Sequence, residues 1–374
     1  MTEIIRVETR EQQKEFVEFP LRMYKNDPYY APELYGDAMK VFTSENVYRN
    51  TCDDVFFLAR KNGKTVGRIQ GIIQKQFNEL HNEKRVRFTR FDSIDDREVS
   101  DALFKAVENW ARGYGMDRFC GPLGYSDLER EGLLIDGFEE LATFEEQYNY
   151  PYYQKLIEGY GFEKEVDWVE YQLRAPKERN PMIAKVAERA LQMNKLHVVD
   201  SSNMSKKEFI NKVKDGVFYC IDECYAKLYG TVPFTEEMKK QLIDQFMLII
   251  NKKYLMVVSD ENGKVVAFGL CFPSLSRALQ KSGGRLTPGG LFRVLHDVAK
   301  PKIIDLALVA VLPEYQARGV PAVMIEGMYD MLTGTGVEYC ETNLNLEDNY
   351  AVQSMWKYFD KKQHKKRRSF VKAI

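Results

Sequence analysis

The sequence predicts an α/β fold of two tandem domains, each with a central sheet flanked by helices. The chain has 374 residues, a length that fits about two domains. Hydrophobic residues make up 44% and charged residues 29% of the chain, so each domain can bury a core. Short apolar runs rich in β-branched residues alternate with segments of helical periodicity along the whole length, which indicates strands interleaved with helices.

The first half of the sequence begins with a helix and continues through strands that enclose a long amphipathic helix. That central helix is the clearest element, because Val99, Leu103 and Trp110 recur on one side of it at helical spacing. The expected elements are a helix at 11–24, hairpin strands at 55–60 and 65–73, a strand at 86–91, the helix at 99–110, a strand at 118–123, a loop at 129–140, a short helix before 159–162 and a strand at 166–173.

A charged segment at 175–181 with two prolines and no periodicity marks a domain boundary, which gives domains at 1–175 and 176–374. The second half shows the same order of elements, which indicates duplication of one α/β unit. Its expected elements are helices after 180, after Ser205, at 218–229 and at 235–250, hairpin strands at 254–258 and 265–272, a partly helical lid or insertion at 273–302, a strand from 303 to Pro313, a following helix, a strand at 337–344 and a last helix at 349–358.

A glycine loop between the strand that stops at Pro313 and the next helix is the candidate ligand site. The first N–H groups of a helix have no internal acceptor and attract anions such as a pyrophosphate. Arg318 adds a cation, and Gly319 allows a ligand to approach the backbone closely. Pro321 removes one N–H donor, and an ordinary strand-to-helix turn with proline at its start is the alternative interpretation.

The segment Gln316-Ala317-Arg318-Gly319-Val320-Pro321 resembles the acyl-CoA pyrophosphate loop of the GNAT N-acetyltransferase superfamily. The whole layout resembles bacterial proteins that carry two GNAT-like domains in tandem. The resemblance implies a mixed central sheet in each domain, acetyl-CoA or another acyl-CoA as cofactor, and transfer of the acyl group to an amine. The cofactor-binding positions that it implies are Val309, Val311, Gln316, Ala317, Arg318, Gly319, Val320, Pro321 and Asn349.

Acyl transfer to an amine needs a base for the amine and an acid for the leaving thiolate. Strand alternation places Glu341 on one face with Asn343 and Asn345, so Glu341 is the first candidate base and Asp305 the second. Many members of the superfamily carry a tyrosine acid on the last helix.

Trp356 occupies the position of that tyrosine, and Tyr358, two residues further on, is the candidate acid. The alternatives are a solvated carboxylate at a strand end for each base candidate and a core aromatic for Tyr358.

The corresponding turn of the first half, at 91–98, has no glycine and four acidic residues. Carboxylates suit the start of a helix but repel a pyrophosphate there. We therefore expect no CoA in the first domain, whose expected roles are structural support and one wall of a cleft between the domains.

Charge and cysteine content limit the partners. The formal net charge is −1, so no overall field draws the chain to nucleic acid or to a membrane. The basic run at 361–368 could bind nucleic acid or an acidic partner, but a solvated terminal hairpin is the expected structure. The six cysteines and four histidines show no disulfide or metal-ligand spacing, which predicts free thiols, no metal and a reducing cytoplasm.

The sequence therefore predicts a cytoplasmic, acyl-CoA-dependent N-acyltransferase, most simply an N-acetyltransferase. The sequence does not distinguish between a small amine, an amino acid, a peptide and a protein N-terminus as the acceptor. It does not indicate the oligomeric state either. One alternative is a degenerate GNAT fold that binds a ligand or partner without catalysis. Another is a nucleic-acid-associated protein that acts through the basic run.

Overall fold

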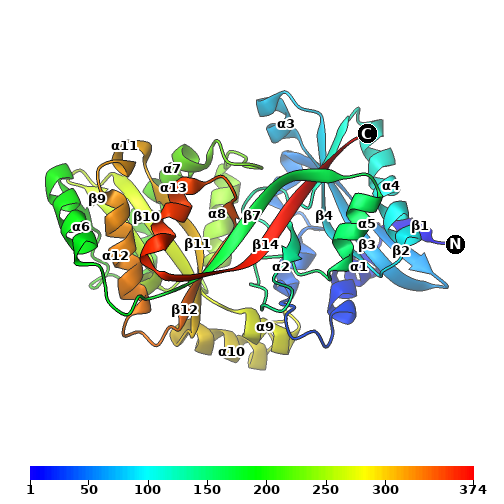
Figure 1. Ribbon diagram of the computed structural model, residues 1–374. Coiled ribbons are helices and arrows are strands. Elements are labelled where there is room, and N and C mark those ends of the chain that lie inside the picture. The colour runs from blue at the N-terminus through cyan, green and yellow to red at the C-terminus, as the bar shows by residue number, and fades with distance from the viewer.

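The computed structural model describes residues 1–374 and is built on one mixed sheet of 14 strands that runs through both halves (Figure 1). The strand order is β1-β2-β3-β4-β5-β14-β7-β12-β11-β10-β9-β8, with β6 paired to β14 and β13 paired to β7. Read inward from one end, the order is β1-β2-β3-β4-β5-β14, and read inward from the other end it is β8-β9-β10-β11-β12-β7. Strands at the same place in these two series are counterparts in the two halves. The duplicated α/β architecture expected from the sequence is therefore confirmed.

The first half contains the elements β1 (Glu3–Arg6), α1 (Arg10–Met23), α2 (Tyr35–Lys40), η1 (Val47–Asn50), β2 (Cys52–Lys61), β3 (Lys64–Gln74), α3 (Lys75–His81), β4 (Arg85–Ser93), α4 (Arg97–Gly113), β5 (Arg118–Gly121), β6 (Leu133–Asp136), α5 (Tyr152–Gly159) and β7 (Glu163–Arg174). The Asn62-Gly63 turn joins β2 to β3, and both residues have positive φ as such a hairpin requires.

The second half contains α6 (Pro181–Asn194), β8 (Leu196–Val198), α7 (Lys206–Tyr225), α8 (Glu236–Phe246), η2 (Lys252–Tyr254), β9 (Leu255–Asp260), β10 (Val265–Pro273), α9 (Ser276–Ser282), α10 (Pro288–Ala299), β11 (Ile303–Val311), α11 (Pro313–Gln316), α12 (Val320–Leu332), β12 (Tyr339–Thr342), β13 (Asn345–Leu346), α13 (Tyr350–Gln353), η3 (Ser354–Tyr358) and β14 (Asp360–Ala373). Ser205 heads α7 with the expected capping box.

The two halves exchange their last strands. β7 belongs to the first half but pairs with β12 of the second, whereas β14 ends the chain and pairs with β5 of the first. These two long strands also pair with each other and bridge the halves (Figure 1). Each therefore completes the other half's core: Leu173 packs in the cluster around α12, and Phe370 packs in the cluster around α4. The division into domains at 1–175 and 176–374 stays a prediction.

The expectation of a solvated hairpin at 361–368 was wrong. These residues form most of β14 near the middle of the sheet, and Lys365 and Arg367 are 1% and 0% exposed. Their charges lie inside because carboxylates from β7 and β12 neutralise them, which a charge count along the chain does not reveal.

The segment expected as a lid or insertion forms α9 and α10, which pack beside the N-terminal helices. Gln280 donates to the carbonyl oxygens of Pro28 and Tyr30, and Arg285 pairs with Glu18 at 2.8 Å. Elsewhere, α7 ends at Tyr225, so the helix expected at 218–229 is the last part of a longer one that stops four residues earlier.

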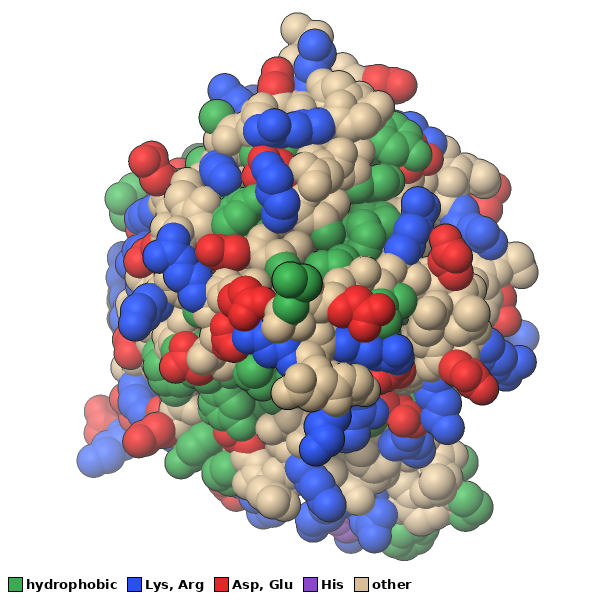
Figure 2. All heavy atoms as spheres, turned by 90° about the vertical axis from the view of Figure 1, so that its right-hand side faces the viewer, with side chains coloured by type: hydrophobic (Ala, Val, Ile, Leu, Met, Phe, Trp, Pro, Cys, Tyr) green, Lys and Arg blue, Asp and Glu red, His purple; other side chains and the backbone are tan.

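Acidic and basic side chains are interspersed over the outer face of the first half (Figure 2). Like the net charge of −1, this mixture gives that face no dominant sign. Each helix is either too short or too polar to cross a bilayer.

Candidate functional site

The glycine loop lies where the sequence places it, between β11 and α12. Gly319 has φ +81° and forms the N-cap of α12, a helix of 13 residues. Gln316, Ala317 and Arg318 are exposed and Gly319 is partly exposed, so the loop is open to an anion, whereas Val320 at the first helical position is fully buried. Pro321 lies in the first turn of α12 and supplies no N–H, so the Gly319 N–H and the Arg318 side chain are the donors left at this end. The residues present fit a pyrophosphate group with fewer backbone donors than an open helix start offers.

Strands β11 and β12 separate beyond a short stretch of pairing. They are parallel neighbours from Ile303 to Leu306 on β11, after which β12 ends at Thr342. The backbone of β11 further along then lacks a strand partner on that side. Such a gap between parallel strands can admit an extended chain that bonds to the free edge.

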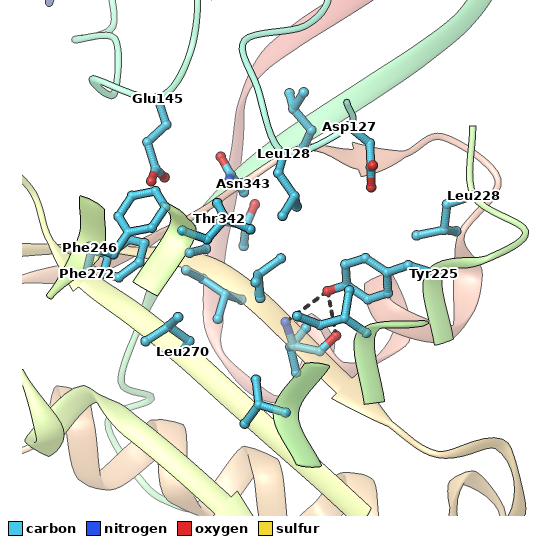
Figure 3. Close-up of a pocket in the computed structure, with 18 of the residues that line it drawn as sticks. Asp127, Leu128, Glu145, Tyr225, Leu228, Phe246, Leu270, Phe272, Thr342 and Asn343 are labelled. Atoms are coloured by element: carbon cyan, nitrogen blue, oxygen red, sulfur yellow. Dashed lines mark hydrogen bonds between the residues drawn. The ribbon is translucent and has the colours of Figure 1, made fainter. Parts of the chain in front are cut away.

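Side chains occupy this free edge of β11. The Tyr225 hydroxyl donates to the Val309 carbonyl oxygen at 3.0 Å and accepts from the Val309 N–H at 3.2 Å (Figure 3). The Val311 carbonyl oxygen accepts from Gln316 Nε2 at 3.0 Å and from Cys224 Sγ at 3.4 Å. A ligand that binds along Val309 and Val311 must therefore displace Tyr225 and Gln316.

A cavity of about 250 Å³ opens at the separation of β11 and β12, between the two halves (Figure 3). Its apolar wall comes from the second half, from helices α7 and α8 and strands β10 and β11. Typical members of that wall are Val213, Leu242, Leu270 and Leu308. Asn349 lines the cavity too, and its side chain caps α13 by accepting from Val352 N–H. Asn343 and Asn345 line it from the strand ends beyond β12.

The opposite wall is a carboxylate rim, made of acidic residues that all belong to loops of the first half. The carboxylate rim consists of Asp127, Glu129, Glu131, Glu145 and Glu146, whereas Lys214 is the single basic residue that lines the cavity. One oxygen each of Asp127, Glu131, Glu145 and Glu146 has no hydrogen-bond partner. Glu131 is 5% and Glu146 is 3% exposed, so these are buried acceptors without a donor.

Burial and mutual repulsion change the acidity of the carboxylate rim. Burial raises the pKa of Glu145 to about 8, and the neighbouring Glu146 charge adds to the rise. Burial also raises the pKa of Glu146 to about 8, against the opposing charge of Arg367. The pKa of Glu131 is raised well above its usual range by burial and by the charges of Asp127 and Glu146. Part of the carboxylate rim therefore holds protons at neutral pH and can exchange them with a ligand.

The two base candidates from the sequence lie together beneath the cavity but do not line it. Asp305 and Glu341 are opposite each other in the β11–β12 register, and both are buried. Glu341 forms an ion pair with Lys365, whereas both oxygens of Asp305 lack a hydrogen-bond partner. Burial raises the pKa of Asp305 well above its usual range, and Glu341 adds to the rise. Their roles in catalysis stay predictions.

Trp356 and Tyr358 take different positions. Trp356 lines the cavity, and its indole N–H donates to Asn345 Oδ1 at 3.1 Å. Tyr358 lies on η3 away from the cavity lining and packs against the core around α12. Its backbone carbonyl accepts from the Tyr329 hydroxyl at 2.7 Å. The role of Tyr358 as an acid therefore stays a prediction without a contact to the cavity.

A buried ionic cluster joins the exchanged strands. Potential ligand atoms of Glu170, Glu341 and His364 lie within 4.8 Å of one another, which would suit a metal ion by distance alone. Lys365 Nζ already contacts Glu341 and lies 3.5 Å from Glu170 Oε2. An ammonium group thus supplies the positive charge at this position.

Comparison with known proteins places the architecture. No protein-family model matches the chain. The chain is 24% identical over 380 residues to the bacterial ceramide synthase of Caulobacter vibrioides (strain NA1000 / CB15N), covering 99% of this chain and 97% of that protein. It is 23% identical over 369 residues to Protein YghO of Escherichia coli (strain K12), covering 96% of this chain and 93% of that one.

Among solved structures, the chain is similar to a tandem GNAT protein from the clavulanic acid biosynthesis pathway. That likeness has a TM-score of 0.56 at 11% identity and covers 100% of this chain and 98% of that one. The fold is therefore that of GNAT N-acetyltransferases, present twice in tandem. The resemblance inferred from the loop at Gln316 is confirmed at the level of the fold.

Sequence reasoning missed the carboxylate rim and Tyr225. Glu145 and Glu146 lie in an irregular segment between β6 and α5, and adjacent carboxylates in a loop look like ordinary solvated residues. Tyr225 ends a helix whose apolar pattern predicts only core packing. The available signal was indirect: a first domain without a cofactor loop was expected to form one wall of a cleft, and its loops carry the acidic residues.

Proposed function

We propose that the protein is an acyl-CoA-dependent N-acyltransferase, with the acyl-CoA bound by the second half and the amine acceptor bound between the halves. The observation that carries the proposal is the arrangement around β11. The exposed loop at Gly319 heads α12, and the strand in front of it parts from β12 to open a cavity. Strand β11 thus leads from the cavity, where the acyl transfer would take place, to the loop that would bind the pyrophosphate.

The residues that would hold the cofactor are those of the loop and the free edge of β11. The Gly319 N–H group and the exposed Arg318 guanidinium suit a pyrophosphate. The backbone groups of Val309 suit the amide groups of an extended pantetheine arm once the Tyr225 hydroxyl moves away. The thioester would then lie in the cavity beside the separated strands.

Glu145 is the residue that the geometry favours as base. Its free oxygen lines the cavity, and its pKa of about 8 suits proton exchange with an amine. The neutral amine nitrogen attacks the thioester carbonyl carbon, so a C–N bond forms and the C–S bond breaks. Glu145 takes the proton lost by the nitrogen, and the thiolate of CoA leaves and takes up that proton from Glu145 through solvent, so that the products are an amide and CoA and Glu145 is ionised again. Asp305 and Glu341 are buried and do not line the cavity, and they stay candidates for carboxylates that accept a further proton.

The name of one relative agrees with this reaction type. A ceramide is an N-acyl amide, so the relative named bacterial ceramide synthase is named for an N-acylation. The sequence alone favours acetyl as the transferred group, because acetyl-CoA is the commonest donor that the resemblance implies. The large apolar wall of the cavity supports a longer acyl group equally well.

The proposal is tested by calorimetric titration of the full chain with acetyl-CoA and with longer acyl-CoAs. We expect binding that is lost in Gly319→Glu, because the new side chain places bulk and negative charge at the phosphate position. The matched control is Gly263→Glu in the β9–β10 hairpin, which has a similar positive φ and open space around it. Arg318→Glu reverses an exposed charge without backbone strain and should weaken binding as well.

Absence of binding for every acyl-CoA would end the transferase proposal. Equal binding by wild type, Gly319→Glu and Arg318→Glu would show that the cofactor binds elsewhere.

A second candidate function is ligand binding without transfer. Two observations favour it: the Tyr225 hydroxyl already occupies the free edge of β11, and Trp356 takes the position of the tyrosine acid. In that case acyl-CoA would bind without turnover for any amine, or the cavity would bind a ligand in the absence of CoA. Product analysis by mass spectrometry after incubation with acyl-CoA and an amine mixture separates the two functions.

A further inference from the structure

The cavity has acidic side chains on one side, the carboxylate rim, and an apolar wall on the other. Five acidic residues of the first half line the cavity, and the remaining wall is built largely from aliphatic and aromatic side chains of α7, α8, β10 and β11. Figure 3 shows Asp127 and Glu145 on one side of the cavity and Leu270 and Phe272 among the apolar side chains. A ligand that satisfies both walls carries a positive nitrogen at one side and hydrocarbon at the other.

The carboxylate rim can receive N–H donors because buried oxygens in it make no hydrogen bond. Glu131 leaves one oxygen without a partner although more than nine-tenths of the residue is buried, and Glu146 Oε2 makes no hydrogen bond but lies 3.7 Å from Arg367 Nε. A buried acceptor without a donor costs free energy that an incoming N–H group recovers. An ammonium or amine brings two or three such donors.

A metal ion is the competing occupant of a carboxylate cluster. In this chain the one group of three potential ligands within 4.8 Å of one another is Glu170, Glu341 and His364, and none of these belongs to the carboxylate rim. The carboxylates of the rim therefore do not converge on one point as the ligands of a metal ion do. Their spacing argues against a metal ion, and an amine can bind to one or two of them.

The apolar wall is larger than a two-carbon acyl group needs. The cavity measures about 250 Å³, and an apolar cavity of roughly 150 Å³ is enough to hold benzene. Leu270, Leu308 and Val217 are only partly buried, so their surface there is open to a ligand. Each methylene that a ligand buries against such a wall strengthens binding by about fourfold.

We infer that this cavity holds the acceptor nitrogen at the carboxylate rim and a hydrocarbon chain against the apolar wall. The chain belongs either to the acyl donor or to the amine. The placement of the nitrogen rests on the proposed transferase function, whereas the binding of a chain does not. At least one of the two substrates thus carries a long hydrocarbon chain. A hydrophilic amine or peptide together with acetyl-CoA is not the preferred pair of substrates.

The first experiment compares short and long ligands by calorimetric titration of the full chain, below the concentration at which the long ones form micelles. Ethylamine is compared with decylamine, and acetyl-CoA with decanoyl-CoA. We expect the long member of at least one pair to bind tenfold more tightly or better, and the pair that shows the effect identifies which substrate carries the chain. Equal affinities within both pairs would overturn the inference while leaving acyl-CoA binding, and hence the proposed function, intact.

Binding of decylamine without binding of any acyl-CoA has the opposite meaning. It would support the chain site and reject the transferase. The two proposals therefore fail on different ligands.

Two substitutions locate the site. Leu270→Trp fills the apolar wall and should reduce the long-over-short preference by about tenfold, whereas Leu248→Trp, on a leucine that is 40% exposed outside the cavity, should leave it unchanged. Retention of the full preference in Leu270→Trp would place the chain elsewhere.

Glu131→Gln keeps the size of the side chain and replaces a carboxyl group, which can give up its proton beside an ammonium, by an amide that cannot ionise, so it should weaken decylamine but not decanoate, which carries the same chain with a negative group. Glu139→Gln at an exposed position of the same half is its control. Decanoate binding as tightly as decylamine to the unmodified protein would overturn the assignment of the carboxylate rim.

Discussion

The two copies of the fold differ most at the turn between their fourth strand and the helix that follows. In the second half the turn is exposed, and Gly319 at the N-cap of α12 offers no capping side chain. In the first half β4 runs to Ser93, and the Asp96 side chain caps α4 by accepting from Glu98 N–H. Lys61 then bonds to both Asp96 and Glu98. The same architecture thus carries an exposed turn without a capping side chain in one copy and a helix end capped by its own side chains in the other.

The gaps between strands differ in the same way. In the second half the gap between β11 and β12 opens into the apolar cavity. A second cavity, of about 170 Å³, lies near β4 and is lined by residues of both halves, with the ion pair of Arg90 and Glu33 among its charged groups. Arg90 has φ +47°, a strained value for a residue with a side chain, and its ion pair holds it there. We propose that one copy has kept the cofactor site, while loops of the other copy supply the acidic residues of the cavity.

The largest expected effect concerns the strands that join the copies. Lys365→Met removes the ammonium group between Glu341 and Glu170 and leaves their negative charges buried. Breaking a buried pair in this way costs about 3–5 kcal/mol of the free energy of unfolding. Chemical denaturation measures it.

The control is Lys366→Met on the same strand, whose partner Asp167 keeps Arg368 and Lys164, so its cost should stay at about 1 kcal/mol or less. Equal costs for the two variants would mean that the link between the copies is not the buried ionic cluster.

The contribution of the first copy to catalysis is tested by Glu145→Gln. Loss of the base should lower kcat by about hundredfold, while acyl-CoA affinity stays unchanged because the cofactor site lies in the other copy. Since the pKa of Glu145 is raised to about 8 and a base must be ionised, the rate of the unmodified protein should rise with pH through about 8. Steady-state kinetics from pH 6 to 10 measure this dependence.

Glu139→Gln serves as the control for that measurement, because Glu139 is exposed and lies outside the cavity lining. An unchanged pH profile and kcat in Glu145→Gln would return the role of base to Glu341 or Asp305.

A smaller effect is expected for Tyr225→Phe in the second copy. The substitution frees the Val309 backbone groups that a cofactor needs, so acyl-CoA should bind more tightly by up to about fivefold, the equivalent of one hydrogen bond. Calorimetric titration measures the affinity. Weaker binding in this variant would show that the hydroxyl contacts the cofactor instead of holding its place.

The smallest expected effect concerns the capped turn of the first copy. Asp96→Ala removes the cap of α4 and should cost about 1 kcal/mol of unfolding free energy. It should create no second cofactor site, because the turn still lacks a glycine and keeps Asp92, Asp95 and Glu98. Thermal unfolding with and without acyl-CoA checks both statements, and a second binding event in the variant would contradict them.

The order of elements and the cofactor loop could be predicted because their signals are local. A glycine loop after an apolar strand, an Asn-Gly hairpin and a helical stripe are each contained in a few neighbouring residues. The exchange of β7 and β14 could not be predicted in this way, because no local pattern shows which copy a strand pairs with, and the charged run at the start of β14 looks solvated. The burial of Arg367 depends on Glu170, which lies 197 residues away in the chain.

The residues of the candidate site also divide into those with a local sequence signal and those without one. Gln316 to Pro321 were identified from their spacing, whereas the carboxylate rim consists of loop residues of the first half that meet the second half only in the folded protein. Glu341 looked like a residue that faces substrate, yet it forms an ion pair with the buried Lys365 of β14, two strands away in the sheet. Long-range pairing of charges decides which carboxylates stay free for a ligand, and no local pattern encodes it.

The central claim is that one copy binds acyl-CoA and the other does not. The most direct measurement is the stoichiometry of acyl-CoA binding to the full chain, determined by calorimetry or by native mass spectrometry. The account gives one acyl-CoA per chain, lost in Gly319→Glu and retained in Gly263→Glu. Two molecules per chain, or one that persists in Gly319→Glu, would contradict it.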